Sequence, residues 1–537
     1  MRSERKFELL LVTIFLLFSW WLMDKSFGYN PITHQMRIAR HQVGDFGLHL
    51  SLIRSFSWGN NFPPQSPFFP GKPLPYHYYF DLFVGTLERL GIRIDIVFNG
   101  LSILVFTVLL FLVYKLPQLI FEKSKLIGLL SVVLFVLHSN LTFIDFFKNK
   151  PFSIMVLKDI WLLPDYIHKG PFDGSLISIF FTLNVFLNQR HLIAGLTISL
   201  FIIYMLLSNI MKEREMSTKN LILLGVILGI SSRVHSLVFL STSVVLLFLF
   251  FFLKRARWIL PFFSPAFLFA FPHLWSIVHQ DTTTLTRDLL SPGFLSEKPF
   301  TFYHFFQYWI YNLGIAIILI PLGVLLSKTK QRIIFFCFLS LFVIANTFQL
   351  SFRIDHNHSL LNYFFIIANF YIAYFLSRLW QRSILEKVGT MVLIFFLTIS
   401  GFIDLMAVKN DFRYPVTDAP GNRFMQWIKD NTEKNAIFLS RQEIFDPVTL
   451  SGRKNYFGTT YYLSVMGYDY REREDLVKTF FEAETIETLE NMRRNGIAYL
   501  VIPVKSVTDF HYQINPSFLS QNLRVVYSDS EVLVYKL

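Results

Sequence analysis

Two acid–base pairs stand at helical spacing near the start of the chain. Asp45 lies four residues before His49, and His77 lies four residues before Asp81. Side chains at this spacing share one face of a helix. The carboxylate of Asp45 either takes part in proton transfer or caps the helix that follows it. His49 either orients that carboxylate, binds a substrate or is an interfacial histidine with no ligand. His77 and Asp81 either form a second polar wall or solvate the chain before the next apolar segment.

Three arginines have the chemistry that phosphate binding needs, because a guanidinium group forms paired hydrogen bonds with phosphate oxygens. They are Arg190, Arg287 and Arg353. The alternative for each is an interfacial arginine held by lipid headgroups. Arg233 and His235 lie in a short turn between two apolar segments, where they either line the same pocket or mark the water boundary.

Another polar group occurs later in the chain. Asp355, His356 and His358 have a spacing that suits a metal ion, but the sequence predicts no further ligand beside them. We therefore expect a hydrogen-bonded loop there. The single cysteine, Cys337, lies inside an apolar segment, so the sequence predicts no internal disulfide and no thiolate metal site.

The elements that must position these residues are apolar segments. Hydrophobic residues make up 53% of the 537-residue chain and charged residues 16%, whereas soluble domains carry about a quarter charged residues. Many apolar runs approach the roughly 20 residues that a helix needs to cross a bilayer. With the short basic loops placed inside, the sequence predicts an α-helical polytopic membrane protein of about 11 spans, with its amino terminus inside and its carboxyl end outside. The predicted spans are 7–23, 98–120, 126–146, 191–211, 220–234, 236–253, 258–277, 303–326, 333–350, 359–378 and 388–406.

In this topology most of the candidate polar residues fall on the outer side. They belong mainly to a large first outer loop at 24–97 and a second at 147–190, and the middles of the spans hold almost no ionisable residues. That distribution disfavours a proton or ion relay through the bilayer. We expect 174–189 to dip into the outer leaflet and return, or to form a short hairpin, with a real span as the alternative. The amphipathic helix at 48–58 is expected to lie flat on the membrane.

The composition changes after residue 406. The range 1–406 is predicted to be the multi-span domain, and 407–537 a small extracytoplasmic α/β domain. The basic balance follows from the inner loops, and the chain shows no nucleic-acid module, so membrane lipids are the expected surroundings and nucleic acid is not an expected partner. Within 407–537 the sequence predicts a helix capped by Asp418, a second helix at 485–495, and strands at 437–439, 498–504, 524–527 and 532–535.

Four features therefore occur together: an amino-terminal span, a large first outer loop with an early Asp, further spans with polar residues outside, and a carboxyl-terminal α/β domain. This architecture, which covers essentially the whole chain, resembles the GT-C superfamily of integral-membrane glycosyltransferases. That superfamily includes the protein mannosyltransferases, the lipid A aminoarabinose transferases and the oligosaccharyltransferase catalytic subunits. The stretches that look like its prokaryotic members are 44–49, 62–76, 355–358, 450–453 and 467–471.

The resemblance implies an inverting glycosyltransferase of the cell (plasma or inner) membrane. Such an enzyme moves a sugar from a polyprenyl-phosphate donor to a lipid, glycan or protein acceptor at the outer face. In the family the early acid of the first loop acts on the acceptor or holds a divalent metal, which implies that Asp45 is the catalytic base and leaves Mg²⁺ or Mn²⁺ open. Asp45 lacks the adjacent second acid that other members carry. The expected substrate-binding residues are His49, His77, Asp81, Arg190, Arg233, His235, Arg287, Arg353 and Asp355.

Two alternatives from other classes remain. A lipid or sugar exporter (flippase) would show deep polar residues and inverted repeats, and the sequence shows neither. A non-catalytic scaffold of envelope assembly would keep the architecture without the chemistry.

Overall fold

The chain folds into two compact units, each assembled from separate stretches of sequence. The computed structural model describes residues 2–121, 124–148, 150–151, 153–279, 289–482, 485–504 and 515–537. The helical unit consists of Met1–Ser26, Leu101–Leu274 and Asp288–Phe412, and the mixed unit consists of Phe27–Gly100, Trp275–Arg287 and Arg413–Leu537. These units divide the chain differently from the predicted ranges 1–406 and 407–537, because the first loop belongs to one unit with the carboxyl-terminal segment.

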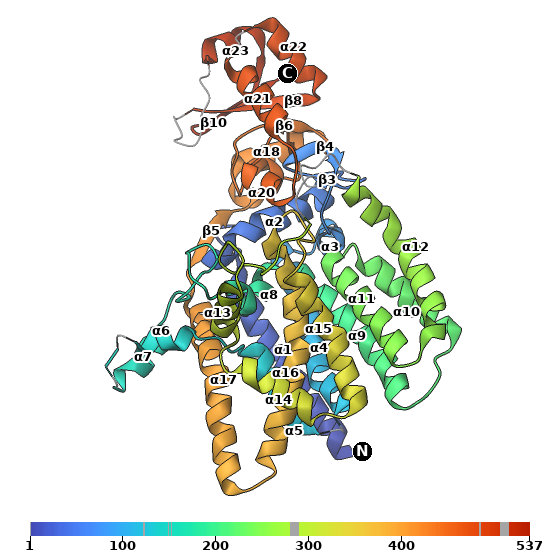
Figure 1. Cartoon of the computed structure of the whole chain (residues 1–537). Helices are drawn as coiled ribbons and strands as arrows, with labels where there is room; N and C mark the ends of the chain where they lie inside the picture. Colours follow the sequence, from blue (N-terminus) through green and yellow to red (C-terminus); the bar gives the residue numbers. More distant parts are fainter. Residues whose placement is uncertain are drawn as a thin grey trace. The chain divides into compact units, whose positions relative to one another are not determined.

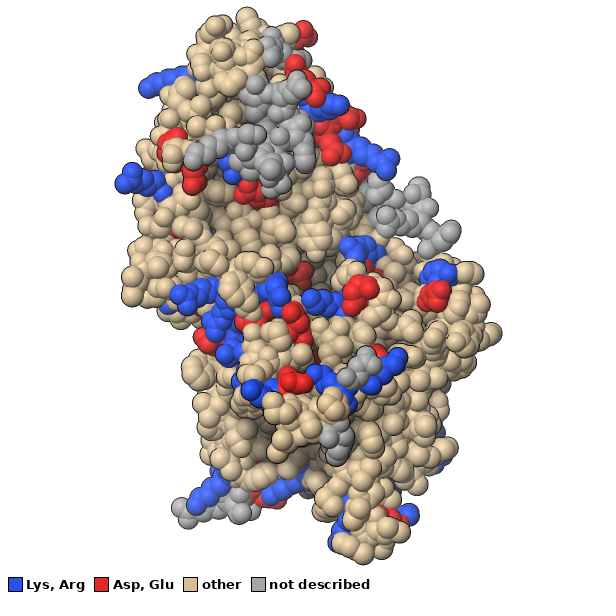
Figure 2. Space-filling model, turned by 90° about the vertical axis from the view of Figure 1, so that its left-hand side faces the viewer, with Lys and Arg blue, Asp and Glu red and all other residues tan. Residues whose placement is uncertain are grey.

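The helical unit is built from apolar helices that pack side by side (Figure 1). Many of its large apolar side chains also face outward; Leu268 is 69% exposed and Leu325 65% exposed. On the face shown in Figure 2, charged side chains gather in patches and leave broad areas with none. Exposed apolar surface of this extent is expected where lipid replaces water.

The elements of the helical unit are α1 (Arg2–Ser26), α4 (Ile94–Ile120, which starts in the mixed unit), α5 (Lys125–Val136), α6 (Thr142–Phe147), α7 (Met155–Trp161), η2 (Ile179–Phe181), α8 (Asn184–Asn188), α9 (Arg190–Met211), α10 (Thr218–Ser231), α11 (Ser236–Phe252), η3 (Ala256–Trp258), α12 (Ile259–Val278), α13 (Phe302–Leu313), α14 (Ala316–Leu326), α15 (Thr329–Ala345), η5 (Ile354–Asn357), α16 (His358–Trp380) and α17 (Ile384–Asn410).

Within the described residues, six helical stretches are long and apolar enough to cross a membrane. They contain α1, α4, α9, α12, α16 and α17. A seventh exists if α13 and α14 count as one span; the two helices bend by 84° at Gly314, which ends α13 with a φ of +53°. The structure thus confirms a helical polytopic protein with a small sheet region, but not the count of about 11 spans, because α5, α10 and α11 are shorter apolar helices.

No single spanning helix forms at 174–189. This stretch contains only the short η2 and α8 within irregular backbone, and Ile177 and 181–187 are buried. Two asparagines from other helices satisfy its backbone: Asn312 Oδ1 accepts from the Ser178 amide at 2.8 Å, and Asn362 Nδ2 donates to the Phe180 carbonyl oxygen at 2.9 Å. Buried backbone outside regular structure needs such partners, and these two asparagines supply them.

The mixed unit combines small sheets with helices. Its elements are β1 (Phe27–Asn30), β2 (Gln35–Ala39), η1 (Arg40–Gln42), α2 (Val43–Ser57), β3 (Gln65–Ser66), β4 (Phe69–Pro73), α3 (Tyr79–Arg89), β5 (Arg413–Thr417), η6 (Ala419–Gly421), α18 (Arg423–Asn431), β6 (Ile437–Leu439), α19 (Pro447–Leu450), β7 (Lys454–Asn455), α20 (Thr460–Val465), α21 (Arg471–Glu482), α22 (Ile486–Arg494), β8 (Ile497–Pro503), α23 (Pro516–Asn522), β9 (Arg524–Ser528) and β10 (Val532–Lys536).

Two of its sheets fix the architecture of the mixed unit. The five-stranded sheet has the order β7-β6-β8-β10-β9, with β6 parallel to β7 and β8 and the other neighbours antiparallel. The three-stranded sheet has the order β1-β2-β5, and it pairs Gln35–Ala39 of the first loop with Arg413–Thr417 of the carboxyl-terminal segment in antiparallel register. The predicted strands at 437–439, 498–504, 524–527 and 532–535 correspond to β6, β8, β9 and β10.

Helix α2 is a core helix of the mixed unit. Every residue from Phe46 to Ser57 is buried, so the prediction that this helix lies flat on the membrane is wrong. Leu48, Leu52 and Phe56 enter one core with residues of the carboxyl-terminal segment. The apolar stripe that suggested a membrane surface instead packs against protein.

Candidate functional site

Asp45 stands in the first turn of α2. The helix begins at Val43 with Gln42 as its N-cap, so Asp45 is not the capping residue. Its side chain is half-buried. The partial positive charge at a helix start favours an anionic carboxylate at this position. Asp45 is therefore a first-turn carboxylate of α2 rather than its cap.

Close backbone approach sets the position of α2 beside α3. A Cβ at Gly85 of α3 would lie 2.7 Å from the carbonyl oxygen of Ile53 and 2.9 Å from Cβ of Phe56, so only glycine permits this packing. The contact brings the first pair of candidate residues next to the second pair. His49 Nδ1 lies 2.9 Å from Asp81 Oδ2, and the two side chains are 3% and 1% exposed.

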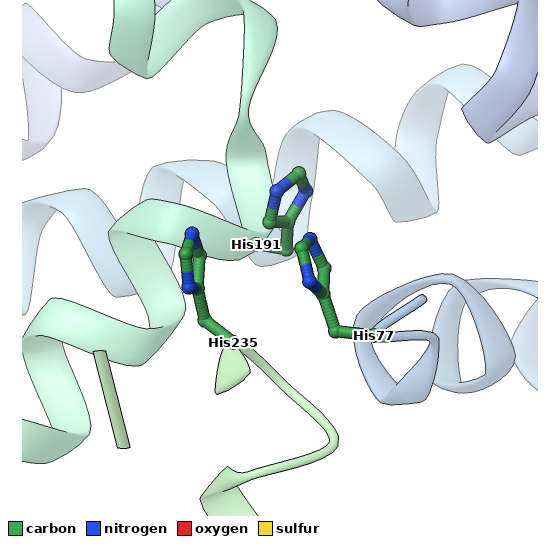
Figure 3. Close-up of side chains that lie close together, drawn as sticks. All are labelled: His77, His191 and His235. Carbon is green, nitrogen blue, oxygen red and sulfur yellow. The ribbon is translucent and has the colours of Figure 1, made fainter. Parts of the chain in front are cut away.

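Two tyrosines share the surroundings of Asp45. Burial and the charges of Asp45 and Asp81 raise the pKa of Tyr76 well above its usual value, and burial and Asp45 do the same to the pKa of Tyr462. Both phenols therefore remain neutral hydrogen-bond donors at physiological pH. The Tyr462 hydroxyl donates to the Gly44 carbonyl oxygen at 2.7 Å. His77, labelled in Figure 3, lies beside Tyr76 with 3.8 Å between ring centroids and a tilt of 31° between the rings.

The acids around Asp45 have the chemistry of a divalent-cation site. Asp81 Oδ1 is buried and has no hydrogen-bond partner among the described residues. The charges of Asp45 and Asp81 both raise the pKa of the Tyr76 phenol, so both carboxylates lie near this side chain. Oxygen donors of this kind suit Mg²⁺ or Mn²⁺. These two carboxylates would supply part of the ligand set of such an ion.

In the helical unit, a histidine cluster forms where α9, α11 and α16 begin. His191 lies in the first turn of α9 and His235 is the N-cap of α11; their ring centroids are 5.4 Å apart (Figure 3). The Gln189 amide nitrogen lies 3.1 Å from Nε2 of His358, and His235 Nε2 lies 3.5 Å from the Ser359 hydroxyl. The structure thus brings together three predicted polar stretches near 188–191, 233–235 and 353–358.

Arg190 is buried between elements of the helical unit. Its Nε donates to the Leu187 carbonyl oxygen at 2.9 Å, and its two terminal nitrogens contact the Met23 sulfur and the Ser26 hydroxyl. All three guanidinium nitrogens are engaged with protein atoms. The observed role of Arg190 is to join α1 to the start of α9.

The remaining predicted arginines also have protein partners where the structure describes them. Arg233 Nη1 donates to the Phe269 carbonyl oxygen at 2.6 Å. Arg353 forms two hydrogen bonds with Asp355, at 3.0 and 2.7 Å. Arg287 lies outside the described residues.

Sequence reasoning did not identify Tyr76 and Tyr462 as members of the site. Tyr76 lies next to a predicted residue, His77, and its aromatic neighbours gave the only local signal. Tyr462 reaches Gly44 from 418 residues away, so no local pattern indicates that contact. A Cβ at Gly47 would lie 2.2 Å from the Tyr462 hydroxyl oxygen, which shows why glycine stands there.

Comparisons with known proteins agree with this architecture. A family model described as an uncharacterized membrane protein family (DUF2298) matches residues 3–158. No curated protein matches the sequence. The cryo-EM structure of the arabinofuranosyltransferase AftD from mycobacteria matches 99% of this chain with a TM-score of 0.55 and 11% identity. A mutant of AftD matches 99% with a TM-score of 0.51 and 12% identity.

This likeness defines the fold class. The chain shares its fold with part of AftD, and over residues 3–158 it is similar to a family of membrane proteins. The chain spans 40% and 41% of the two AftD chains, so it corresponds to about two fifths of their length. The likeness to AftD concerns the fold alone.

Proposed function

We propose that the protein is an inverting GT-C glycosyltransferase with Asp45 as its catalytic base. It transfers a sugar from a polyprenyl-phosphate donor to a hydroxyl group of a lipid, glycan or protein acceptor. One observation carries the proposal: a half-buried carboxylate at a helix start stands beside a buried His49–Asp81 pair and two neutral phenols. The AftD-like fold supports the same class of reaction.

The reaction is a single displacement at the anomeric carbon of the donor sugar. Asp45 accepts the proton of the acceptor hydroxyl as its oxygen forms a bond to the anomeric carbon. The bond between that carbon and the phosphate oxygen breaks, and the phosphate leaves with the bonding electrons. The configuration at the anomeric carbon inverts because the acceptor attacks from the face opposite the phosphate.

The neighbours of Asp45 have supporting roles in this proposal. Asp81 fixes the His49 ring, and both residues are proposed substrate-binding groups. The Tyr76 phenol stays protonated and donates a hydrogen bond to a substrate oxygen. Asp45 and Asp81 would hold a divalent cation, whose charge would favour departure of the phosphate.

The membrane topology remains part of the proposal. The amino terminus lies inside, about 11 segments cross or enter the cell membrane, and the first loop and the carboxyl-terminal segment face outward. This orientation is supported by the basic loops and gives the polyprenyl donor access from the outer leaflet. His77, Arg190, Arg233, His235, Arg287, Arg353 and Asp355 remain proposed substrate-binding residues.

The proposal is tested by Asp45→Asn in the full chain reconstituted in vesicles. Radiolabelled polyprenyl-phosphate sugars, arabinofuranose among them because AftD is an arabinofuranosyltransferase, are supplied with a membrane extract as acceptor. We expect transfer to fall by about 10²- to 10⁴-fold, the contribution of a general base. Asp475→Asn makes the same change at an exposed position of α21 and is expected to leave transfer unchanged.

Two outcomes would overturn the proposal. Transport of labelled lipid without any transfer product would show an exporter. Equal transfer by the Asp45→Asn and Asp475→Asn variants would show that the carboxylate of Asp45 takes no part in the chemistry.

A further inference from the structure

A cavity of about 370 Å³ opens in the mixed unit near the carboxyl-terminal end of α2. Its volume falls within the roughly 300–1,000 Å³ typical of small-molecule sites. The wall includes Tyr29, Arg54, Trp58, Glu88, Arg93 and Asp418, which come from four separate segments of the unit. Nothing in the proposed transfer reaction uses these residues.

The charges in the wall compensate one another. Arg54 Nη1 lies 3.0 Å from Glu88 Oε1, and its Nη2 lies 2.8 Å from Asp418 Oδ1. Arg93 is paired with Asp95, whose Oδ2 lies 2.9 Å from Nη2. The lining itself carries two guanidinium groups, of Arg54 and Arg93, and two carboxylates, of Glu88 and Asp418, so it presents no net formal charge to a phosphate or to a metal ion. A neutral ligand fits this wall best.

Hydrogen-bonding capacity remains after these pairs form. The side chain of Arg54 is 1% exposed, and its Nε has no hydrogen-bond acceptor among the described residues. This nitrogen is closed off from the cavity, so the groups that can accept from a ligand hydroxyl are the phenol and carboxylate oxygens of the wall. The Tyr29 hydroxyl donates to Asp418, and burial and that carboxylate raise the pKa of Tyr29 to about 12. The wall thus carries fixed polar groups that suit hydroxyls.

Aromatic surface completes the wall. The Trp58 ring lies under the Arg54 guanidinium, 3.5 Å from its carbon to the ring centroid, and the Arg93 guanidinium lies 4.7 Å from the Tyr29 ring centroid. Both rings are therefore held in place by cations. Rigid aromatic edges and faces beside a few fixed polar groups are a common arrangement for ligands that have both apolar and polar sides.

We propose that this cavity is a saccharide-binding site that holds a neutral sugar unit of the acceptor. That the bound sugar belongs to the acceptor rests on the proposed function, whereas the binding of a saccharide does not. Arg54 follows Asp45 by nine positions on α2, which corresponds to about 13 Å along the helix axis. The site therefore engages a sugar unit at a distance from the reacting hydroxyl and selects acceptors that are long enough to reach both places.

The test measures binding of neutral oligosaccharides to the full chain in detergent, without a sugar donor. The probes are maltotriose, cellotriose and mannotriose, and their binding is measured by saturation-transfer NMR. We expect at least one of them to bind with a Kd of about 1 mM or tighter. Ile92→Trp places a large side chain at the cavity wall, where Ile92 is 41% exposed, and is expected to weaken binding at least tenfold.

Ile96→Trp is the matched control. Ile96 is 55% exposed on α4, four positions further along the chain, and is not part of the cavity wall, so its variant should bind as the unchanged chain does. Absence of binding by all three probes would overturn the proposal. So would equal binding by the two tryptophan variants, or competition by inorganic phosphate. A chain that binds the saccharide and transfers no sugar would sink the proposed function while leaving this site in place.

Discussion

At residue 49 an imidazole is buried against the carboxylate of Asp81. The two atoms are 2.9 Å apart and water has almost no access to either side chain. Asp81 Oδ1 has no partner among the described residues, so the bond from His49 is the stabilising contact of this carboxylate that the structure shows directly. A buried acid that loses its partner keeps the cost of leaving water. His49 therefore stabilises the mixed unit in addition to any contact with substrate.

Two replacements of His49 are expected to distinguish the loss of its contact with Asp81 from the loss of side-chain packing. His49→Ala leaves Asp81 buried without a donor and should lower the free energy of unfolding by about 3–5 kcal/mol. His49→Gln keeps a nitrogen donor and should lower the free energy of unfolding by clearly less than His49→Ala does. Denaturant unfolding of the full chain in detergent measures both, with His304→Ala, in the helical unit, as the control expected within about 0.5 kcal/mol of the original chain. Equal stability of all three variants would contradict this account of the pair.

At the scale of elements, the sequence predicts those helices and strands that depend on local residue patterns. The strands β6, β8, β9 and β10 were predicted from runs of β-branched and aromatic residues. Helix α22 follows its expected signals: the Thr485 side chain accepts from the Thr488 amide, and Gly496 with a φ of +79° follows its end. Asp418 was predicted to cap a helix and instead caps the short η6, whereas Asn422 caps α18.

Local pattern could not predict what depends on distant partners. Helix α2 has the apolar stripe of a surface helix, but the residues that cover it include Tyr462 and Leu463. Arg54 was not identified as a candidate because Asp418, one of its partners, lies 364 residues away. The predicted pairs at 45–49 and 77–81 met through His49 and Asp81. The helical spacing was right for Asp45 and His49, which both lie in α2, but wrong for His77, which lies before the start of α3. The packing of α2 on α3 supplied the contact between the pairs.

Gly47 shows how tightly one element is held. An added Cβ would lie 2.2 Å from the Tyr462 hydroxyl oxygen and 2.6 Å from the carbonyl oxygen of Ile444, and backbone cannot move aside easily. Gly47→Ala is therefore expected to lower the free energy of unfolding by about 1–3 kcal/mol or more. Gly100→Ala on α4 meets nothing within 4 Å and should be neutral or stabilising by up to about 1 kcal/mol. Thermal unfolding of the two variants checks the contrast, and a Gly47→Ala chain as stable as Gly100→Ala would refute it.

At the scale of the whole molecule, the mixed unit joins stretches that are far apart in sequence. Strand β2 pairs with β5, the Arg54 side chain binds Asp418, and Arg453 donates to the Trp58 carbonyl oxygen at 3.1 Å. The Arg453 side chain also donates to the carbonyl oxygens of Ile428, Lys429 and Thr432, so it fixes the end of α18 beside α2. The predicted motif at 450–453 thus has a structural role. Because the helix that carries Asp45 is packed by these contacts, the two ends of the mixed unit should fold together.

Removal of 413–537 tests this dependence. A chain ending at 412 would leave the β2 edge unpaired, Arg54 without Asp418, and Leu48 and Leu52 without part of their core. We expect proteases to cut such a chain within 27–100 at least tenfold faster than the full chain, since local opening controls cleavage. Cuts are located by mass spectrometry after brief digestion of detergent-solubilised protein. Supplying 413–537 as a separate chain should restore protection, because the lost contacts are non-covalent. Equal resistance of 27–100 to cleavage with and without the carboxyl-terminal segment would show that the first loop folds alone. The geometry around Asp45 would then not depend on Tyr462.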